Sequence, residues 1–151
     1  MLFMMGFLSG VISAGDQVTE FNPKELQTLQ VFKNNIFVLF SMLVVGTLTG
    51  SVYSLFVVFF NGMIVGETLF TVYNSVGIKP IISGFLPHAV FETLSILLVS
   101  AITCYPLLVL VRQKKNPIRF GKSFLEVTTI LITAFLLCSL ASIIEGNFST
   151  F

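Results

Sequence analysis

The sequence predicts an all-α protein, a polytopic bundle of about five transmembrane helices. Of its 151 residues, 55% are hydrophobic and 10% are charged, whereas about a quarter of the residues in soluble domains are charged. The run from Ile36 to Gly77 contains a single charged residue, Glu67. At about 1.5 Å per residue this run is about twice as long as a hydrocarbon core of ~30 Å. It therefore predicts two crossings.

Five apolar segments predict the helices of one domain that covers residues 1–151. They are residues 1–15, 29–46, 51–77, 81–111 and 125–144. The first segment is only just long enough to reach most of the way across. It carries no basic residue before its apolar stretch, which favours a retained helix over a cleaved signal peptide. Asn22 and Pro23 suit the cap and first position of an interfacial helix that leads into the second segment.

The turn between the second and third crossings has two candidate positions. The stretch Gly46–Ser51 is the favoured one, because it is rich in glycine, serine and threonine. Asn61-Gly62 is the alternative, because this dipeptide accommodates positive φ.

Basic residues are concentrated in one loop, residues 112–122, between the last two apolar segments. They are Arg112, Lys114, Lys115, Arg119 and Lys122. The positive-inside rule assigns this loop to the cytoplasm, so the N-terminus is cytoplasmic and the C-terminus lies outside. The loop lacks interleaved aromatic residues, so no nucleic-acid partner is expected. It is instead the natural contact for a cytoplasmic partner.

Three pairs of glycines stand four residues apart. They are Gly6 and Gly10, Gly46 and Gly50, and Gly62 and Gly66. At this spacing two glycines share a helix face and allow another backbone to approach closely, as in many membrane helix pairs. The pairs predict closely packed helices.

Polar residues are expected to converge in the outer half of the bilayer. Counting back from the cytoplasmic loop places the Pro87 region at the outer end of its helix, in the first turn. The expected cluster is Asn34, Asn35, Asn61, Gly62, Glu67, Pro87, His88, Glu92 and Glu145. Polar groups inside a membrane are costly and are often functional. The alternative is that these residues contact headgroups and water, or that His88 and Glu92 form a structural hydrogen bond.

The cluster also offers acid–base chemistry. His88 would act as general base or acid, with Glu92 one helical turn away orienting it. Glu145 or Glu67 would be a second carboxylate, and Asn61 a donor to a developing oxyanion. No serine or cysteine stands out as a nucleophile, and Cys104 and Cys138 are interpreted as packing residues. One histidine with three glutamates is a poor zinc signature, so neither a metal nor a cofactor is expected.

The order of these motifs resembles the stage II sporulation protein M family of bacterial integral membrane proteins. The motifs are Lys33-Asn34-Asn35-Ile36, Asn61-Gly62 with Gly66, Leu86-Pro87-His88 with Glu92, and Ala141-Ser142-Ile143-Ile144-Glu145-Gly146. The resemblance runs roughly from Gly6 to Glu145. Family members often have glycine where this chain has Ala89, and a longer region before the first span.

The resemblance implies a multi-pass protein of the bacterial cytoplasmic membrane. The chain is most similar to the short family members found in circular bacteriocin gene clusters. These members occur there beside an ATPase and other small membrane proteins. The expected function is therefore a component that matures or exports a membrane-active peptide, with a separate ATPase and other membrane subunits as partners. Three alternatives remain: an intramembrane peptide-processing enzyme, a sporulation engulfment scaffold, and an immunity or proton-coupled transport protein. Whether the protein is an enzyme, and whether it forms oligomers, stay open.

Overall fold

A computed structural model describes residues 1–15, 28–106 and 120–148. Over these residues the chain forms helices and no strand, which confirms the all-α prediction. The helices are α1 (Leu2–Gly15), α2 (Thr28–Ser41), α3 (Val52–Val76), α4 (Ile78–Pro80), α5 (Leu86–Thr103) and α7 (Phe120–Phe148). The π-helical segment η1 (Met42–Gly46) continues α2, and η2 (Ile81–Phe85) joins α4 to α5.

Four helical stretches in the described part of the chain are long and apolar enough to cross a membrane. They are Leu29–Gly46, Val52–Val76, Ile78–Thr103 and Phe124–Glu145. The fifth helix, α1, is apolar but has only 14 residues. Its length of about 21 Å is less than that of a ~30 Å hydrocarbon core. The bundle thus has five main helices, four of which have the length of a full span.

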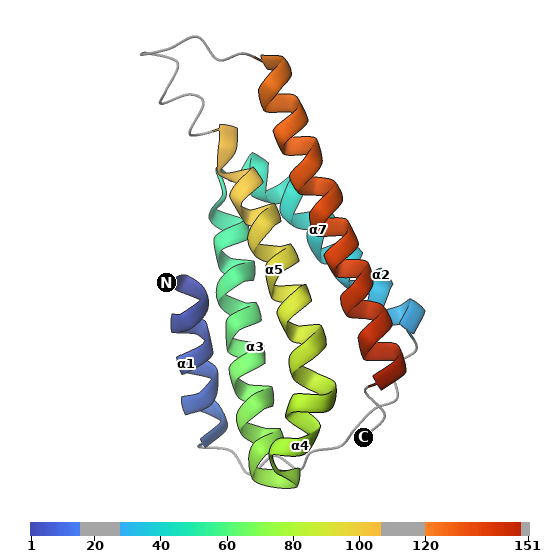
Figure 1. Cartoon of the computed structure of the whole chain (residues 1–151). Coiled ribbons are helices and arrows are strands. Elements are labelled where there is room, and N and C mark those ends of the chain that lie inside the picture. The colour runs from blue at the N-terminus through green and yellow to red at the C-terminus, as the bar shows by residue number, and fades with distance from the viewer. Residues whose placement is uncertain (16–27, 107–119, 149–151) are drawn as a thin grey trace.

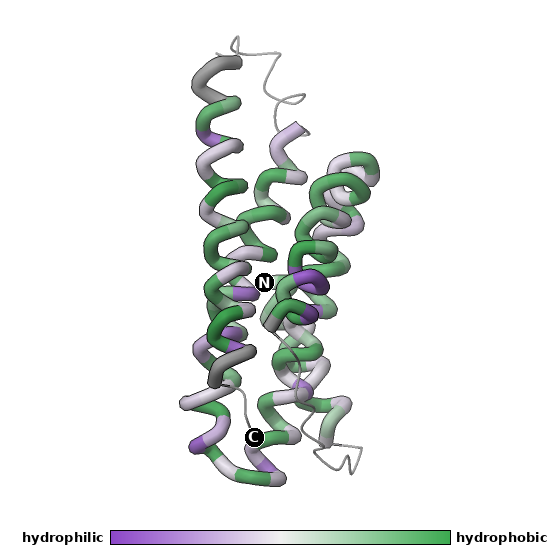
Figure 2. Tube along the Cα trace, turned by 90° about the vertical axis from the view of Figure 1, so that its right-hand side faces the viewer, coloured by the Kyte–Doolittle hydropathy of each residue, from purple (hydrophilic) through white to green (hydrophobic). Residues whose placement is uncertain are grey.

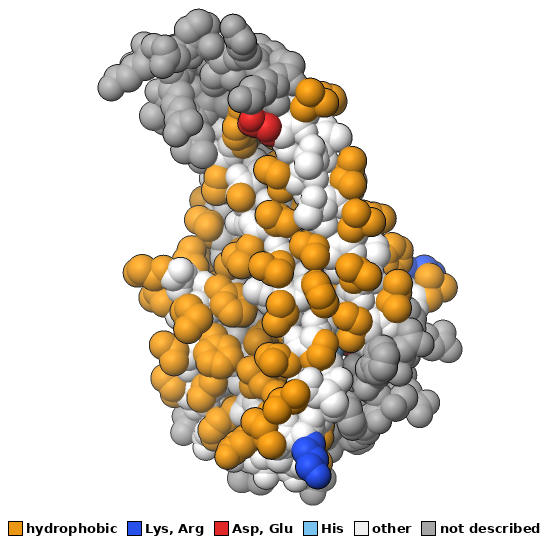
Figure 3. All heavy atoms as spheres, in the orientation of Figure 1, with side chains coloured by type: hydrophobic (Ala, Val, Ile, Leu, Met, Phe, Trp, Pro, Cys, Tyr) orange, Lys and Arg blue, Asp and Glu red, His pale blue; other side chains and the backbone are white. Residues whose placement is uncertain are grey.

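The surface of the bundle is apolar along the length of its helices. Hydrophobic residues predominate along the tube in Figure 2, and hydrophobic side chains spread over the face seen in Figure 3. Large exposed side chains include Phe37, Phe40 and Phe56. In water such a surface would aggregate, whereas in a bilayer it contacts lipid tails. The protein is therefore a membrane protein.

Successive long helices alternate in direction (Figure 1). The helix α1 runs parallel to α3, because Gly6 lies against Phe59 while Gly10, one turn later, lies against Met63. The C-terminal end of α5 and the N-terminal end of α7 point to the same end of the bundle.

The predicted basic loop joins α5 to α7. Four of its residues, Arg112, Lys114, Lys115 and Arg119, lie outside the described residues, and so does the side chain of Lys122. Asn22 and Pro23, which were expected to start an interfacial helix, also lie outside them. Which end of the bundle faces the cytoplasm stays a prediction of the positive-inside rule.

The chain turns between α2 and α3 within the stretch Gly46–Ser51. The backbone N–H of Ser51 donates to the carbonyl oxygen of Gly46 at 2.6 Å. Gly50 and Ser51 both have positive φ, 59° and 74°. The alternative turn at Asn61-Gly62 is wrong, because both residues lie in the middle of α3.

The core lies where α2, η1, α3, α5 and α7 meet. It consists of Leu39, Met42, Val58, Ile96, Val99, Ala134 and Cys138. Met42 is completely buried, and the core residues of α5 and α7 pack beside it. Cys138 is a free cysteine that fills space in this core.

Glycines bring α1 and α3 into backbone contact. A Cβ on Gly10 would clash with the carbonyl oxygen of Met63, and one on Gly66 would clash with that of Phe7. Gly6 and Gly62 make the corresponding contacts one turn earlier. The pair Gly46 and Gly50 does not share a helix face, because Gly50 lies in the turn with positive φ.

Candidate functional site

The site begins with an irregular stretch of helix. Gly77, with φ of 87°, ends α3, and the chain then runs helically from Ile78 through η2 into α5. Pro87 lies in the first turn of α5, as predicted, but the helical stretch that contains α5 already begins at Ile78, so Pro87 is not at the end of the span. Proline has no N–H to donate and its ring crowds the carbonyl four residues earlier. A π-helical segment directly before it accommodates this disruption.

His88 is buried next to this irregularity, with 9% of its surface exposed. Its Nδ1 lies 3.0 Å from the carbonyl oxygen of Gly84. Because a carbonyl oxygen only accepts, Nδ1 carries the proton and donates it. The ring also packs edge-on against Phe85, with centroids 5.2 Å apart. The orientation of the imidazole is thus fixed from within its own helix, and its Nε2 is the nitrogen left for other chemistry.

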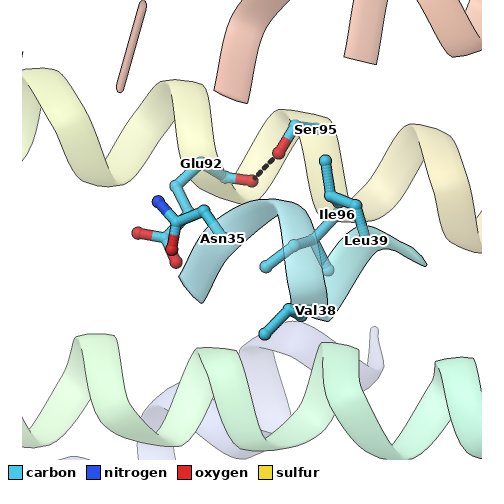
Figure 4. A pocket seen from close by; sticks show the side chains of 6 residues that line it. All are labelled: Asn35, Val38, Leu39, Glu92, Ser95 and Ile96. Atoms are coloured by element: carbon cyan, nitrogen blue, oxygen red, sulfur yellow. Dashed lines mark hydrogen bonds between the residues drawn. The ribbon is translucent and has the colours of Figure 1, made fainter. Parts of the chain in front are cut away.

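Glu92 lies one helical turn after His88 and borders a narrow cavity between α2 and α5. The cavity is lined by Asn35, Val38, Leu39, Glu92, Ser95 and Ile96 (Figure 4). Its volume of about 10 Å³ holds at most one water molecule. The Nδ2 of Asn35 is buried and has no hydrogen-bond partner in the described part of the chain. Figure 4 shows Asn35 and Glu92 side by side at this cavity.

The last helix, α7, carries Glu145. This helix packs along α5 in the opposite direction, with Cys138 in the same core cluster as Ile96 and Val99. Glu145 lies about two turns after Cys138, which brings it toward the level of Glu92 and His88. The helices α5 and α7 thus carry an imidazole and two carboxyl groups at a similar level of the bundle.

These groups lie deeper than the sequence indicated. Counting from the basic loop placed His88 and Glu92 near the outer boundary. The described span begins at Ile78, so both residues lie near its midpoint. The count failed because the helix extends further toward Gly77, where the chain turns.

Other residues of the expected cluster lie elsewhere. The Oδ1 of Asn61 accepts a hydrogen bond from Thr93 Oγ1 at 3.3 Å, which links α3 to α5. Gly62 and the backbone of Glu67 face α1. Asn34 is exposed on α2. Asn61 thus ties two helices together, and Glu67 is placed against α1.

Three contacts at the site were missed by sequence reasoning. They involve Gly84, Thr93 and Ser95, the last donating through its hydroxyl to the Glu92 carbonyl oxygen at 2.7 Å. The sequence spacing is compatible with two of these contacts, since Gly84 stands one helical turn before His88 and Ser95 stands one turn after Glu92. Small polar residues in a membrane helix are too common for that spacing to be decisive.

The arrangement can bind and transfer protons. Among the described residues, no group of three or more His, Cys, Asp and Glu is placed to hold a metal ion. The hydroxyls of Ser95 and Ser142 donate to carbonyl oxygens of their own helices. The imidazole of His88 and the carboxyl groups of Glu92 and Glu145 are acid–base groups.

The fold and the site together define a polytopic helical membrane protein with a buried histidine and two glutamates on neighbouring helices. A family model described as stage II sporulation protein M matches residues 1–150. The chain belongs to this family. No curated protein and no solved structure matches it.

Proposed function

We propose that this protein is a non-enzymatic membrane subunit of a bacterial machine that matures or exports a membrane-active peptide. The observation that carries the proposal is family membership over almost the whole chain, residues 1–150. The role proposed for this chain follows from the resemblance of its motifs to short family members from circular bacteriocin gene clusters, where they occur beside an ATPase. The bacterial cytoplasmic membrane is the corresponding location.

The interior of the bundle favours a subunit over an enzyme. A cavity of about 10 Å³ beside Glu92 is too small for a segment of peptide. The buried hydroxyls of Ser95 on α5 and Ser142 on α7 donate hydrogen bonds to the carbonyl oxygens of Glu92 and Cys138, respectively. A hydroxyl nucleophile needs a base within hydrogen-bond reach, and these two hydroxyls are instead turned to the backbone.

The energy for export would come from a separate ATPase in the same complex. The basic loop, residues 112–122, is the proposed contact for it, since a cluster of lysine and arginine attracts an acidic surface. The apolar outer faces of the helices would contact lipid and the other membrane subunits.

The test is mass spectrometry of the peptide made by cells that carry the whole gene cluster. Four strains are compared: wild type, a deletion of this gene, His88→Ala and Glu92→Gln, the last two at matched membrane abundance. The deletion should lower mature peptide at least about tenfold. Both variants should still yield mature peptide, because a subunit that holds partners does not need the cluster for bond cleavage.

Two results would contradict the proposal. Unchanged mature peptide in the deletion strain would show that the protein has no part in maturation or export. Accumulation of unprocessed precursor in both variants, with partners still bound, would assign peptide processing to His88 and Glu92 and make the protein an enzyme.

A further inference from the structure

A side-chain amide is enclosed between α2 and α5 without a hydrogen-bond partner. The Nδ2 atom of Asn35 on α2 is buried, and no atom in the described part of the chain accepts a hydrogen bond from it. Nearly all buried polar groups in folded proteins bond to protein or to ordered water, because an unpaired donor in an apolar interior is costly. The core of a bilayer supplies no bulk water to pair it. The amide therefore calls for a bound molecule that accepts a hydrogen bond.

The cavity beside this amide limits the size of such a molecule. Its volume is about 10 Å³, which is the space of a single water molecule. Leu39 and Ile96, two of the residues that line it, belong to the apolar core. Ser95 also lines it, but its hydroxyl donates to the main-chain carbonyl oxygen of Glu92 at 2.7 Å. A ligand with more than one non-hydrogen atom does not fit.

The two polar side chains at the cavity select the chemistry of the ligand. Asn35 and Glu92 both line the cavity, and Figure 4 shows them side by side. The amide N–H groups only donate, whereas the carboxyl group offers acceptor oxygens. A metal cation or an ammonium ion cannot accept a hydrogen bond from the amide, and a carboxylate repels a monatomic anion. Water meets both demands, because it accepts from the amide and donates to the carboxyl oxygen.

We propose that this cavity is a binding site for one water molecule, which joins the amide of Asn35 to the carboxyl group of Glu92. Two polar partners are the minimum that holds a buried water. A bridge of this kind is nearly as favourable as a direct hydrogen bond. It links α2 to α5 across the edge of the core. The proposal concerns how α2 is held in the bundle and does not depend on the peptide or on the ATPase.

The test is solid-state NMR on full-length protein in lipid bilayers, labelled with ¹⁵N-asparagine, with magnetisation transferred from water protons to the side-chain amides. Asn35→Leu identifies the Asn35 signal by its loss, and Asn34→Leu, the matched control at the exposed neighbouring position, retains that signal. We expect transfer from water to the Asn35 amide in wild type. In Glu92→Leu the amide signal should remain, whereas the transfer from water should be lost.

Val38→Ile displaces the water by volume alone. Val38 lines the cavity, and one added methylene group fills a space of this size while both polar partners stay in place. The transfer should be lost in this variant and unchanged in Val44→Ile, the same substitution at an exposed position of η1. If Glu92→Leu does not reach the membrane, the comparison of Val38→Ile with Val44→Ile still decides.

Three results would overturn the proposal. The first is a wild-type Asn35 amide that receives no magnetisation from water, which would indicate a direct bond between Asn35 and Glu92. The second is a transfer as strong in Val38→Ile and in Glu92→Leu as in wild type. The third is a change of the Asn35 signal when choline chloride is replaced by sodium chloride, which would assign the cavity to a cation.

Discussion

His88 and Gly84 are joined by a hydrogen bond of 3.0 Å from the imidazole Nδ1 to a main-chain carbonyl oxygen one helical turn earlier. The bond lies where η2 meets α5, directly beside Pro87. A proline at this position removes a backbone donor from the helix. The side chain of His88 therefore reinforces the segment that the proline weakens, and it does so with a ring that the same contact orients.

Replacing His88 by Phe should destabilise the protein by about 1–3 kcal/mol. The variant keeps an aromatic ring for packing but leaves a buried carbonyl oxygen without its side-chain donor. Denaturant unfolding in detergent micelles measures the change. Phe85→Leu is the control for ring packing alone, and should cost about 0.5–1.5 kcal/mol through the lost edge-on contact. An unfolding midpoint of His88→Phe equal to that of wild type would mean that the bond to Gly84 contributes nothing.

Gly10→Ala should separate α1 from α3, whereas Gly15→Ala should not. A methyl group on Gly10 meets the backbone of Met63 and Glu67, which cannot move aside as a flexible side chain can. Overpacking of this kind costs about 1–3 kcal/mol. At Gly15 the nearest atom belongs to the Phe70 ring at 3.9 Å, an ordinary contact. Thermal unfolding of both variants measures the difference, and equal stabilities would refute the close approach of the two backbones.

The fold was predictable because a bilayer leaves few choices. Long apolar runs must form helices to satisfy their backbone groups, and the confirmed all-α bundle follows from that constraint. The position of the turn between α2 and α3 was also predictable from its residue types, since Gly50 adopts positive φ where the favoured turn was expected. The π-helical segments were not foreseen. The segment η1 packs against α3 and α5, and η2 packs against α3 and α7, and a pattern of residue types does not contain this packing.

The site was predictable only in part. His88 and Glu92 share a helix face by spacing alone, and the alternating directions of the helices return Glu145 toward their level in the bundle. Depth was misjudged because the helical stretch begins at Ile78, further from the basic loop than the count assumed. Asn61 was expected to donate a hydrogen bond to a developing oxyanion. In the structure its Oδ1 instead accepts a hydrogen bond from Thr93 on α5. Which of several polar residues pair across helices depends on rotation about each helix axis, which the sequence does not specify.

Ser51→Gly should stabilise the protein by about 1–2 kcal/mol. Ser51 has φ of 74°, a conformation that strains a residue with a Cβ but not glycine. Its hydroxyl is buried and has no partner in the described part of the chain, so its removal also relieves a desolvation cost. Ser54→Ala is the contrasting variant, because the Ser54 hydroxyl donates to the Met42 carbonyl oxygen. The melting temperature should rise in the first variant and fall in the second. A fall in both would show that the Ser51 hydroxyl makes a stabilising contact.

Asn61 and Thr93 should be energetically coupled across α3 and α5. The four proteins of a double-mutant cycle are wild type, Asn61→Leu, Thr93→Val and the double variant. The hydrogen bond of 3.3 Å between the two side chains should give a coupling energy of about 0.5–1.7 kcal/mol, the range of such bonds between membrane helices. Unfolding in micelles gives the four stabilities. Because Thr93→Val retains the shape of the side chain, it removes the donor without opening a cavity. A coupling energy of zero would mean that Asn61 does not serve to hold α3 against α5, and would return its amide to the role of a donor toward a bound substrate.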